Sequence, residues 1–220
     1  MSEITLLDVK HDERVRVYVE KANEQMAAIG FTEHGFRHAG IVAGMAQGIP
    51  RQLGLLVRDA ELAGIAGFLH DIGNVINRNI HTETGAVLAH HILTSMGMEA
   101  VEIAVILGAI GNHEEGTGFP INAVSASVII ADKSDVHFSR VQNPNPVSFD
   151  IHDRVNFAVQ KSYLRVDASQ KVISLELTIN TESASVMEYF EIFLQRMLMC
   201  RKAANVLGCK FKMIINGAEI

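Results

Sequence analysis

The stretch GFLHDIGN, residues 67–74, ends an apolar run with an imidazole and a carboxylate, those of His70 and Asp71. Burial of either group is unfavourable unless the group has a partner. The pair therefore either lies in solvent at the end of a helix or serves a purpose inside the protein. The rest of the chain decides between these two interpretations.

The composition is that of a globular protein. The chain has 220 residues, of which 48% are hydrophobic, enough for one domain with a small addition. No apolar run approaches the roughly 18 residues of a transmembrane helix, and the charged N-terminus does not resemble a signal peptide. The two cysteines, Cys200 and Cys209, favour a reducing compartment over a disulfide framework. We therefore expect a cytoplasmic protein without a membrane partner.

The charge distribution argues against one class of partner. The formal net charge is −6, and the lysines and arginines form no block. Broad binding to a nucleic acid polymer depends on neutralising phosphates, so such a polymer is not expected as the partner. A small phosphorylated ligand held through a metal ion is compatible with this charge.

Residues 12–160 are predicted to be mainly helical. Apolar periodicity, capping residues and glycine stops place helices at about 12–30, 32–47, 58–70, 82–96, 99–112 and 122–140. The segment 142–148, with two prolines and two asparagines, is a break, and a shorter helix follows at about 150–163. This part is predicted to form a helical domain, residues 1–160.

The C-terminal part has a different pattern. Residues 162–180 are predicted to form two strands around a polar turn, 181–208 a long helix, and 209–217 a final strand. The fold class is therefore mainly α, with a small ββαβ appendage at residues 161–220 (α+β). The appendage is expected to pack on the helical domain or on a partner subunit. Because the long helix is too apolar to remain in water, we expect it to pack on the sheet with one side and on a partner with the other. A homo-oligomer formed through the C-terminal region is the corresponding prediction.

Four of the predicted helices carry an imidazole or a carboxylate at or near their apolar face. In 32–47, His34 and His38 precede Ile41 by seven and three residues, which is helical spacing. His113 lies at the end of 99–112, Asp132 continues the apolar face of 122–140, and the His-Asp doublet ends 58–70. These side chains are all directed at one core.

A single histidine in such a place is more often a packed or surface residue than a ligand. Several ionisable groups directed at one core are harder to explain in this way, because buried charges are usually paired or bound to metal. Imidazole together with carboxylate suits divalent ions such as Mn, Fe, Co, Ni or Zn. The absence of cysteine from the set argues against a structural zinc site.

The ordered series His34, His70-Asp71 and Asp132 resembles the H…HD…D signature of the HD-domain metal-dependent phosphohydrolase superfamily. The segments TEHGFRHAGIVAGMA (32–46), AGFLHDIGN (66–74) and IIADKSDV (129–136) resemble the family's first histidine helix, its doublet and its terminal aspartate helix. The resemblance covers about residues 30–140. It implies an HD-domain-like helical bundle in which these four residues hold one divalent metal.

Two further segments resemble the binuclear branch of this superfamily. HTETGAVLAHHIL (81–93) resembles the helix start that supplies a histidine to a second metal, here His81. NHEEGTGFP (112–120) resembles the histidine and Gly-x-Gly-Tyr-Pro segment of the HD-GYP subgroup, which makes His113 the other ligand. Asn112 replaces that subgroup's first histidine and GFP replaces GYP, so cyclic-dinucleotide hydrolysis is not implied. One or two divalent ions (Mn, Fe, Co, Ni, Mg or Zn) are the expected cofactors.

The resemblance also implies roles beside the ligands. Asp71 would bridge the two metals and share in catalysis. Lys133 stands where the family places a lysine near the site, as a phosphate contact or a partner of a ligand, and a solvated lysine is the alternative. His38 is either a hydrogen-bond donor to a ligand, a general acid or a packed core histidine. Arg78 lies where a substrate phosphate would be bound, although a loop arginine is usually solvated.

Three functions are consistent with these residues. The leading hypothesis is a metal-dependent phosphohydrolase that cleaves a phosphomonoester or phosphodiester of a small metabolite or nucleotide with a metal-activated hydroxide. The alternatives are a non-catalytic module that senses a nucleotide or metal, and a dimetal oxygenase on the same fold. Because a sensor need not keep both Asp71 and Asp132, the intact ligand set weighs against it.

Overall fold

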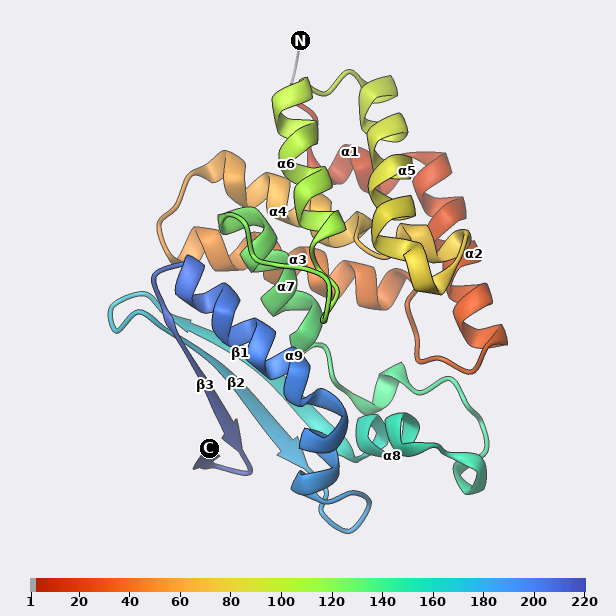
Figure 1. Ribbon diagram of the computed structural model, residues 1–220, viewed down its shortest axis with the longest axis vertical. Helices are drawn as coiled ribbons and strands as arrows, with labels where there is room; N and C mark the ends of the chain where they lie inside the picture. Colours follow the sequence, from red (N-terminus) through yellow and green to blue (C-terminus); the bar gives the residue numbers. More distant parts are fainter. Residues whose placement is uncertain (1–2) are drawn as a thin grey trace.

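A bundle of helices lies above a small C-terminal sheet in the computed structural model of the protein (Figure 1). The structure describes residues 3–220. The prediction of a mainly α fold with a small β appendage is confirmed.

The helical part contains α1 (Leu6–His11), α2 (Glu13–Ala28), α3 (Phe36–Gln52), α4 (Val57–Leu69), α5 (His81–Met96), α6 (Ala100–Gly111), α7 (Ala123–Ser134) and α8 (Ile151–Ala158). Four 3-10 segments lie between them, η1 (Ile72–Val75), η2 (Arg78–Ile80), η3 (Phe138–Arg140) and η4 (Pro146–Ser148). The predicted helices are present with shifted ends. The helix α1 was not predicted, because six residues are too few to show a periodicity.

Two shifted helix ends affect the candidate ligands. The helix α3 begins at Phe36, and not near Thr32, because the Glu33 carboxylate accepts a hydrogen bond from the Gly35 N–H at 2.7 Å. His34 therefore lies in the loop before the helix, where its own N–H donates to Asn23 at 2.9 Å. The helix α7 ends at Ser134, and not near residue 140, because the backbone turns away from helical geometry at the next residue.

Close packing of α3 and α4 fixes the position of the His-Asp doublet. A Cβ atom at Gly67 would lie 3.1–3.2 Å from the Val42 carbonyl oxygen and from atoms of Ala43 and Ala46, so a larger residue would push the two helices apart. The helix α7 packs against both. The three helices share an apolar core, and the C-terminal end of α4 points into the middle of the bundle (Figure 1).

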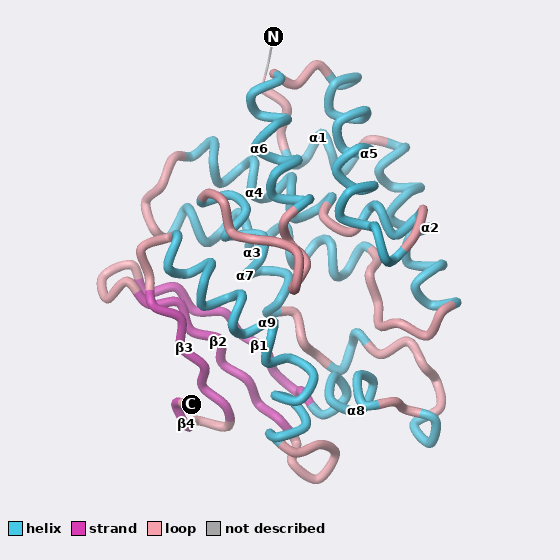
Figure 2. The backbone as a smooth tube through the Cα atoms, viewed as in Figure 1, coloured by secondary structure: helices cyan, strands magenta, loops and turns pink. Residues whose placement is uncertain are grey.

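The C-terminal sheet has four strands, β1 (Val159–Asp167), β2 (Val172–Ile179), β3 (Lys210–Ile215) and β4 (Ala218–Glu219). They lie side by side in this order, in magenta in Figure 2. The pairs β1–β2 and β3–β4 are antiparallel, whereas β2 and β3 are parallel. The helix α9 (Val186–Val206) makes the connection that a parallel pair requires. The two-residue strand β4 was not predicted, because it is too short to show an alternation.

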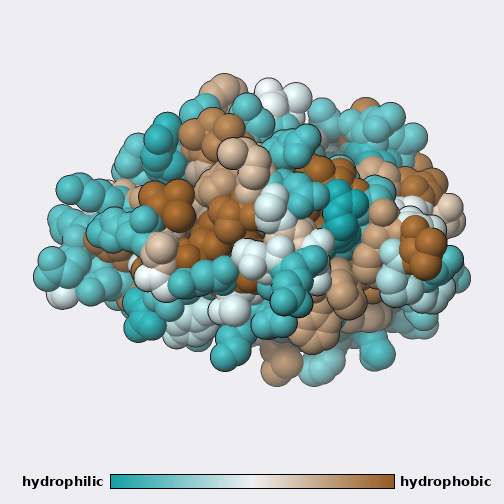
Figure 3. Space-filling model, turned by 90° about the horizontal axis from the view of Figure 1, so that it is seen from below, coloured by the Kyte–Doolittle hydropathy of each residue, from teal (hydrophilic) through white to brown (hydrophobic). Residues whose placement is uncertain are grey.

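The helix α9 lies between the sheet and the helical part of the same chain. A second apolar cluster joins Tyr189, Phe193 and Met197 of α9 to the inward side chains of β2 and to Ile129 of α7. The apolar side of α9 that we expected a partner subunit to cover is thus in contact with α7. The face of the molecule seen in Figure 3 has small groups of apolar side chains among polar ones. The two-domain division and the homo-oligomer stay predictions.

Two findings bear on the predicted cellular location. Among residues 3–220, no helix is both long enough and apolar enough to cross a membrane. Cys200 and Cys209 are both free and buried. A cytoplasmic location stays a prediction.

The start of α9 gives a test of stability against pH. Glu188 accepts hydrogen bonds from the Ser185 N–H and from Arg154 of α8, both at 2.7 Å, and these contacts lower its pKa to about 2. A carboxylate with a lowered folded pKa stabilises the protein above its unfolded pKa and loses this effect as the pH falls through the folded value. Glu188→Gln should therefore lower the melting temperature near pH 7, and the difference from wild type should shrink from about pH 5 towards about pH 3.

The matched control is Glu191→Gln, an exposed glutamate of the same helix, which should melt like wild type. If the melting temperature of Glu188→Gln stays below that of wild type by the same amount across this pH range, the lowered pKa of Glu188 is contradicted.

Candidate metal centre

Histidines and aspartates from five parts of the chain converge inside the helical part. They are His34 in the loop before α3, His38 in α3, His70 and Asp71 at the end of α4, His81 at the start of α5, His113 after α6, and Asp132 in α7. His34 and Asp132 are partly exposed, and the other five are buried. The structure therefore brings together every residue that the sequence singled out as a ligand.

The first cluster surrounds the Nε2 atom of His38. This atom lies 3.2 Å from His70 Nε2, 3.6 Å from Asp71 Oδ2 and 3.4 Å from Asp132 Oδ1. His70 Nε2 lies 3.2 Å from Asp71 Oδ2 and 3.6 Å from Asp132 Oδ1. Each of the two imidazole nitrogens thus lies within 3.6 Å of an oxygen of both carboxylates.

The second cluster joins α5 to the end of α6. His81 Nε2 lies 3.1 Å from His113 Nε2. Asp71 Oδ1 lies 3.5 Å from His81 Nε2 and 3.8 Å from His113 Nε2. Asn74 donates from Nδ2 to Asp71 Oδ1 at 2.9 Å and so orients the carboxylate. Asp71 therefore turns one oxygen to each cluster, as a carboxylate that bridges two ions would.

The rings of these histidines are held in one orientation by hydrogen bonds at Nδ1. The acceptors are the carbonyl oxygens of Thr32 for His34, Gly67 for His70, Arg78 for His81 and Ile110 for His113, and the Asp135 carboxylate for His38. With the proton on Nδ1, the Nε2 lone pair faces inward, as in metal-binding histidines. The Nε2 atoms of His38 and His70 face each other at 3.2 Å, and those of His81 and His113 at 3.1 Å. Two lone pairs this close need a cation or a further proton between them.

The charges of the first cluster also require a cation. Burial opposes the charged form of His70, but Asp71 and Asp132 outweigh it and raise the His70 pKa to about 10. Burial favours the neutral form of Asp71, yet His70 and His34 hold the Asp71 pKa well below its usual range. The two carboxylates therefore stay ionised and hold a proton on a buried imidazole. A divalent ion bound to the same atoms would serve this purpose better.

His34 and His38 differ in their distance from the clusters. His34 Nε2 lies 4.0 Å from Asp71 Oδ2, and burial together with Arg140 holds its pKa well below the usual value. Within the described residues, the groups whose ligand atoms lie within 4.8 Å of one another include His38 but not His34. The geometry thus favours His38 over His34 as the ligand from this segment, because α3 begins later than predicted.

Asp135 supports the first cluster and was not singled out from the sequence. Its carboxylate contacts His38 Nδ1 at 2.7 Å and accepts from Arg37 at 3.0 and 3.1 Å. Burial alone would raise the pKa of Asp135, but His38 and Arg140 lower it below its usual range. The segment IIADKSDV contained a signal, because Asp135 follows Asp132 by one helical turn.

Lys133 is buried and holds the side of Asp132 that faces away from the first cluster. Its Nζ lies 2.7 Å from Asp132 Oδ2 and 2.6 Å from Glu115 Oε2. Burial opposes its charge, but Asp132 and Glu115 keep the Lys133 pKa above the usual value. Glu114, also not singled out, lies 3.5 Å from His81 Nε2. Lys133 is therefore a charged partner of a candidate ligand, one of the two roles that the resemblance implied.

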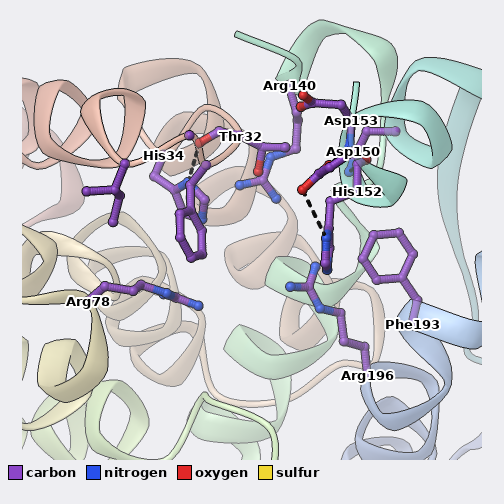
Figure 4. A pocket seen from close by; sticks show the side chains of 13 residues that line it. Thr32, His34, Arg78, Arg140, Asp150, His152, Asp153, Phe193 and Arg196 are labelled. Carbon is purple, nitrogen blue, oxygen red and sulfur yellow. Dashed lines mark hydrogen bonds and ion pairs between the residues drawn. The ribbon is translucent and has the colours of Figure 1, made fainter. Parts of the chain in front are cut away.

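A cavity of about 250 Å³ opens beside the two clusters (Figure 4). Its wall includes His34, the three arginines Arg78, Arg140 and Arg196, and Asp150 before α8. Arg140 and Arg196 were not predicted from the sequence, because their segments reach the cavity only through the tertiary fold.

Comparison with known proteins places a family match in the helical part. Residues 33–137 match the model of the HD domain family. The uncharacterized protein MJ1020 of Methanocaldococcus jannaschii is 26% identical over an alignment of 196 residues, and the match covers 78% of this chain and 74% of that protein. A crystal structure of a predicted HD superfamily hydrolase from an uncultured Thermotogales bacterium is 24% identical, covers 58% of this chain and 69% of that chain, and has a TM-score of 0.45. The matched range 33–137 contains both clusters and ends before α8, the sheet and α9.

Gly73 brings the second cluster to Asp71. A Cβ atom there would lie 2.0 Å from the His81 carbonyl oxygen and 2.5 Å from the Gly85 nitrogen. The absence of a side chain at this position therefore allows η1 to touch α5. Gly73→Ala should therefore destabilise the protein by about 3 kcal/mol or more and separate His81 from Asp71.

Chemical denaturation measures this effect. The control is Gly44→Ala, at an exposed position inside α3 with nothing within 4 Å of the added Cβ, which should stabilise by roughly 0.5–1 kcal/mol. Equal stability of Gly73→Ala and wild type would contradict the close approach.

Proposed function

Because residues 33–137 belong to the HD-domain family, we propose that this protein is a metal-dependent phosphohydrolase that cleaves a phosphoester of a small metabolite or nucleotide. The observation that carries the proposal is the shared carboxylate of Asp71, with one oxygen directed at each cluster. Paired metal sites of this kind serve phosphoester hydrolysis.

The donor set fits divalent ions. His38, His70, Asp71 and Asp132 would hold the first ion, and His81, His113 and Asp71 the second. Bound ions would lower the pKa of a coordinated water and polarise a phosphoryl oxygen. Imidazole and carboxylate ligands suit Mn, Fe, Co, Ni or Zn, and availability shares in the choice among them.

The remaining side chains have roles that follow from their positions. Lys133 keeps Asp132 ionised and directed at the first cluster. Arg78 and Arg140 line the space above the clusters and would bind phosphoryl oxygens. His34 lies at the edge of the same space with Nε2 unprotonated, which makes this atom a suitable proton acceptor.

Hydrolysis by this site has a simple balance. The oxygen of a water forms a bond to phosphorus, and its proton passes to a base such as His34 Nε2. The bond between phosphorus and the leaving oxygen breaks, and that oxygen takes up a proton. The products are a phosphate and an alcohol.

Metal content and turnover test the proposal together. Wild type should retain up to two ions per chain and hydrolyse p-nitrophenyl phosphate or bis(p-nitrophenyl) phosphate. Asp71→Ala, which removes the shared ligand, should lose metal and lower the rate by at least about 100-fold. The control is His90→Ala, an exposed histidine of α5, which should match wild type.

Other outcomes separate the alternatives. Wild type without bound metal would end the proposal. Stoichiometric metal and nucleotide binding without turnover would indicate a sensor, and activity that requires iron and oxygen would indicate an oxygenase.

The roles of His34 and His38 are separable by experiment. His38→Ala removes a proposed ligand and should weaken metal binding at least about tenfold, measured by competition with a chelator. His34→Ala should keep the metal and hydrolyse the substrate more slowly than wild type. Metal loss in His34→Ala with retention in His38→Ala would reverse the assignment.

A further inference from the structure

The cavity beside the clusters is the approach to them. It shares His34, Arg78, Arg140 and Arg196 with a much smaller space that Asp71, Asp132 and Lys133 also line. A molecule in the cavity can therefore place one end at the proposed metal centre.

The side of the cavity next to the clusters is strongly cationic. Figure 4 shows the guanidinium groups of Arg78, Arg140 and Arg196 directed at the same space from three parts of the chain. Arg196 Nε contacts Glu115 at 2.8 Å, and Arg140 donates to the Glu33 carbonyl oxygen at 2.7 Å. Each guanidinium has five N–H donors, so these contacts engage only part of each group. Arg78 contacts Glu114 at 3.3 Å in the same way. Each arginine is thus paired with the protein on one side and keeps N–H donors that a bound dianion can engage.

The other side of the cavity carries hydrogen-bond acceptors. Asp150 caps α8 by accepting from the Asp153 N–H at 2.8 Å, and its second oxygen lies 3.6 Å from His152 (Figure 4). Asp153 and Asn156 line the same wall. A carboxylate here repels a phosphate and attracts hydroxyl or amino groups.

The size of the cavity limits its ligand. At about 250 Å³ it lies just below the range of roughly 300–1,000 Å³ that is usual for drug-sized ligands. A small metabolite fits this volume, whereas a polynucleotide or a large diester does not.

From these three observations we infer that the substrate is a small phosphomonoester whose end remote from the phosphate carries hydroxyl or amino groups, an inference that rests on the proposed function. A phosphomonoester carries about −1.5 to −2 charges near pH 7, which matches the three guanidinium groups better than the single charge of a diester. Arg196 binds the phosphoryl group, and Asp150 binds the remote donors.

This inference gives the C-terminal part a function. Arg196 and Phe193 belong to α9, and Asp150 precedes α8, so all three lie outside the residues that match the HD family. Phe193 is buried, and the Arg196 guanidinium lies 4.7 Å from its ring centroid, which holds the arginine at the cavity. The α9 helix thus supplies a wall of the substrate site.

Steady-state kinetics of the full chain with bound metal test the inference. The substrates are ribose 5-phosphate for hydroxyl groups, phosphoethanolamine for an amino group, butyl phosphate without either, and bis(p-nitrophenyl) phosphate as the diester. We expect kcat/KM for one of the first two to exceed that for butyl phosphate by at least about tenfold. Whichever of ribose 5-phosphate and phosphoethanolamine has the higher kcat/KM shows whether hydroxyl groups or an amino group bind at the end of the cavity remote from the phosphate.

Two variants and one control assign the residues. Arg196→Gln should raise KM about tenfold or more for all monoesters, whereas Arg201→Gln, an exposed arginine of the same helix, should match wild type. Asp150→Ser keeps a side chain that can cap α8 and should lower kcat/KM for the preferred substrate much more than for butyl phosphate. A higher kcat/KM for the diester than for the monoesters would overturn the inference. So would the same KM values in Arg196→Gln and Arg201→Gln, or the same loss of kcat/KM for the preferred substrate and for butyl phosphate in Asp150→Ser.

Failure of the proposed function gives a different result. If metal-loaded wild type hydrolyses none of these esters, calorimetric titration with inorganic phosphate still tests the anion site. Binding that Arg196→Gln abolishes would support the site without the hydrolase, and no binding by wild type would overturn both.

Discussion

Two carboxylates inside the helical part, those of Asp71 and Asp132, impose the main constraint on this protein. Both remain ionised among imidazoles in the interior, so the site must hold positive charge. His70 supplies that charge as a proton, and Lys133 supplies it from the other side of Asp132. The rest of the helical part can be understood as the scaffold that holds these charges together.

Small residues make this scaffold possible. Gly67 lets α4 approach α3, and Gly73 lets η1 touch α5, so that ligands from distant segments reach one place. Backbone carbonyl oxygens then fix the orientations of four imidazole rings through Nδ1, and the Asp135 carboxylate fixes that of His38. A rigid constellation of this kind is what metal binding requires, because its ligands must be oriented before the ion arrives.

The sequence predicted the centre of the site better than its surroundings. The His70-Asp71 doublet and Asp132 follow from local patterns, and so do His81 and His113, because each lies at a helix end within a motif. The sequence could not show that His38 lies closer to the other ligands than His34 does, since the start of α3 depends on the Glu33 side chain.

Residues brought in by the tertiary fold could not be predicted at all. Arg140 and Arg196 have no motif around them and reach the cavity only because η3 and α9 pack beside the clusters. The apolar character of α9 was correctly recognised, but the sequence could not show that α7 of the same chain would cover it. The cavity, and with it the proposed substrate class, therefore depends on packing that no local pattern encodes.

The most direct test of the central claim is an anomalous-difference map from crystals grown with Mn²⁺. Two peaks on opposite sides of the Asp71 carboxylate, one beside His38 and His70 and one beside His81 and His113, are the predicted result. Ions found only at surface carboxylates, with none in contact with Asp71, would contradict it.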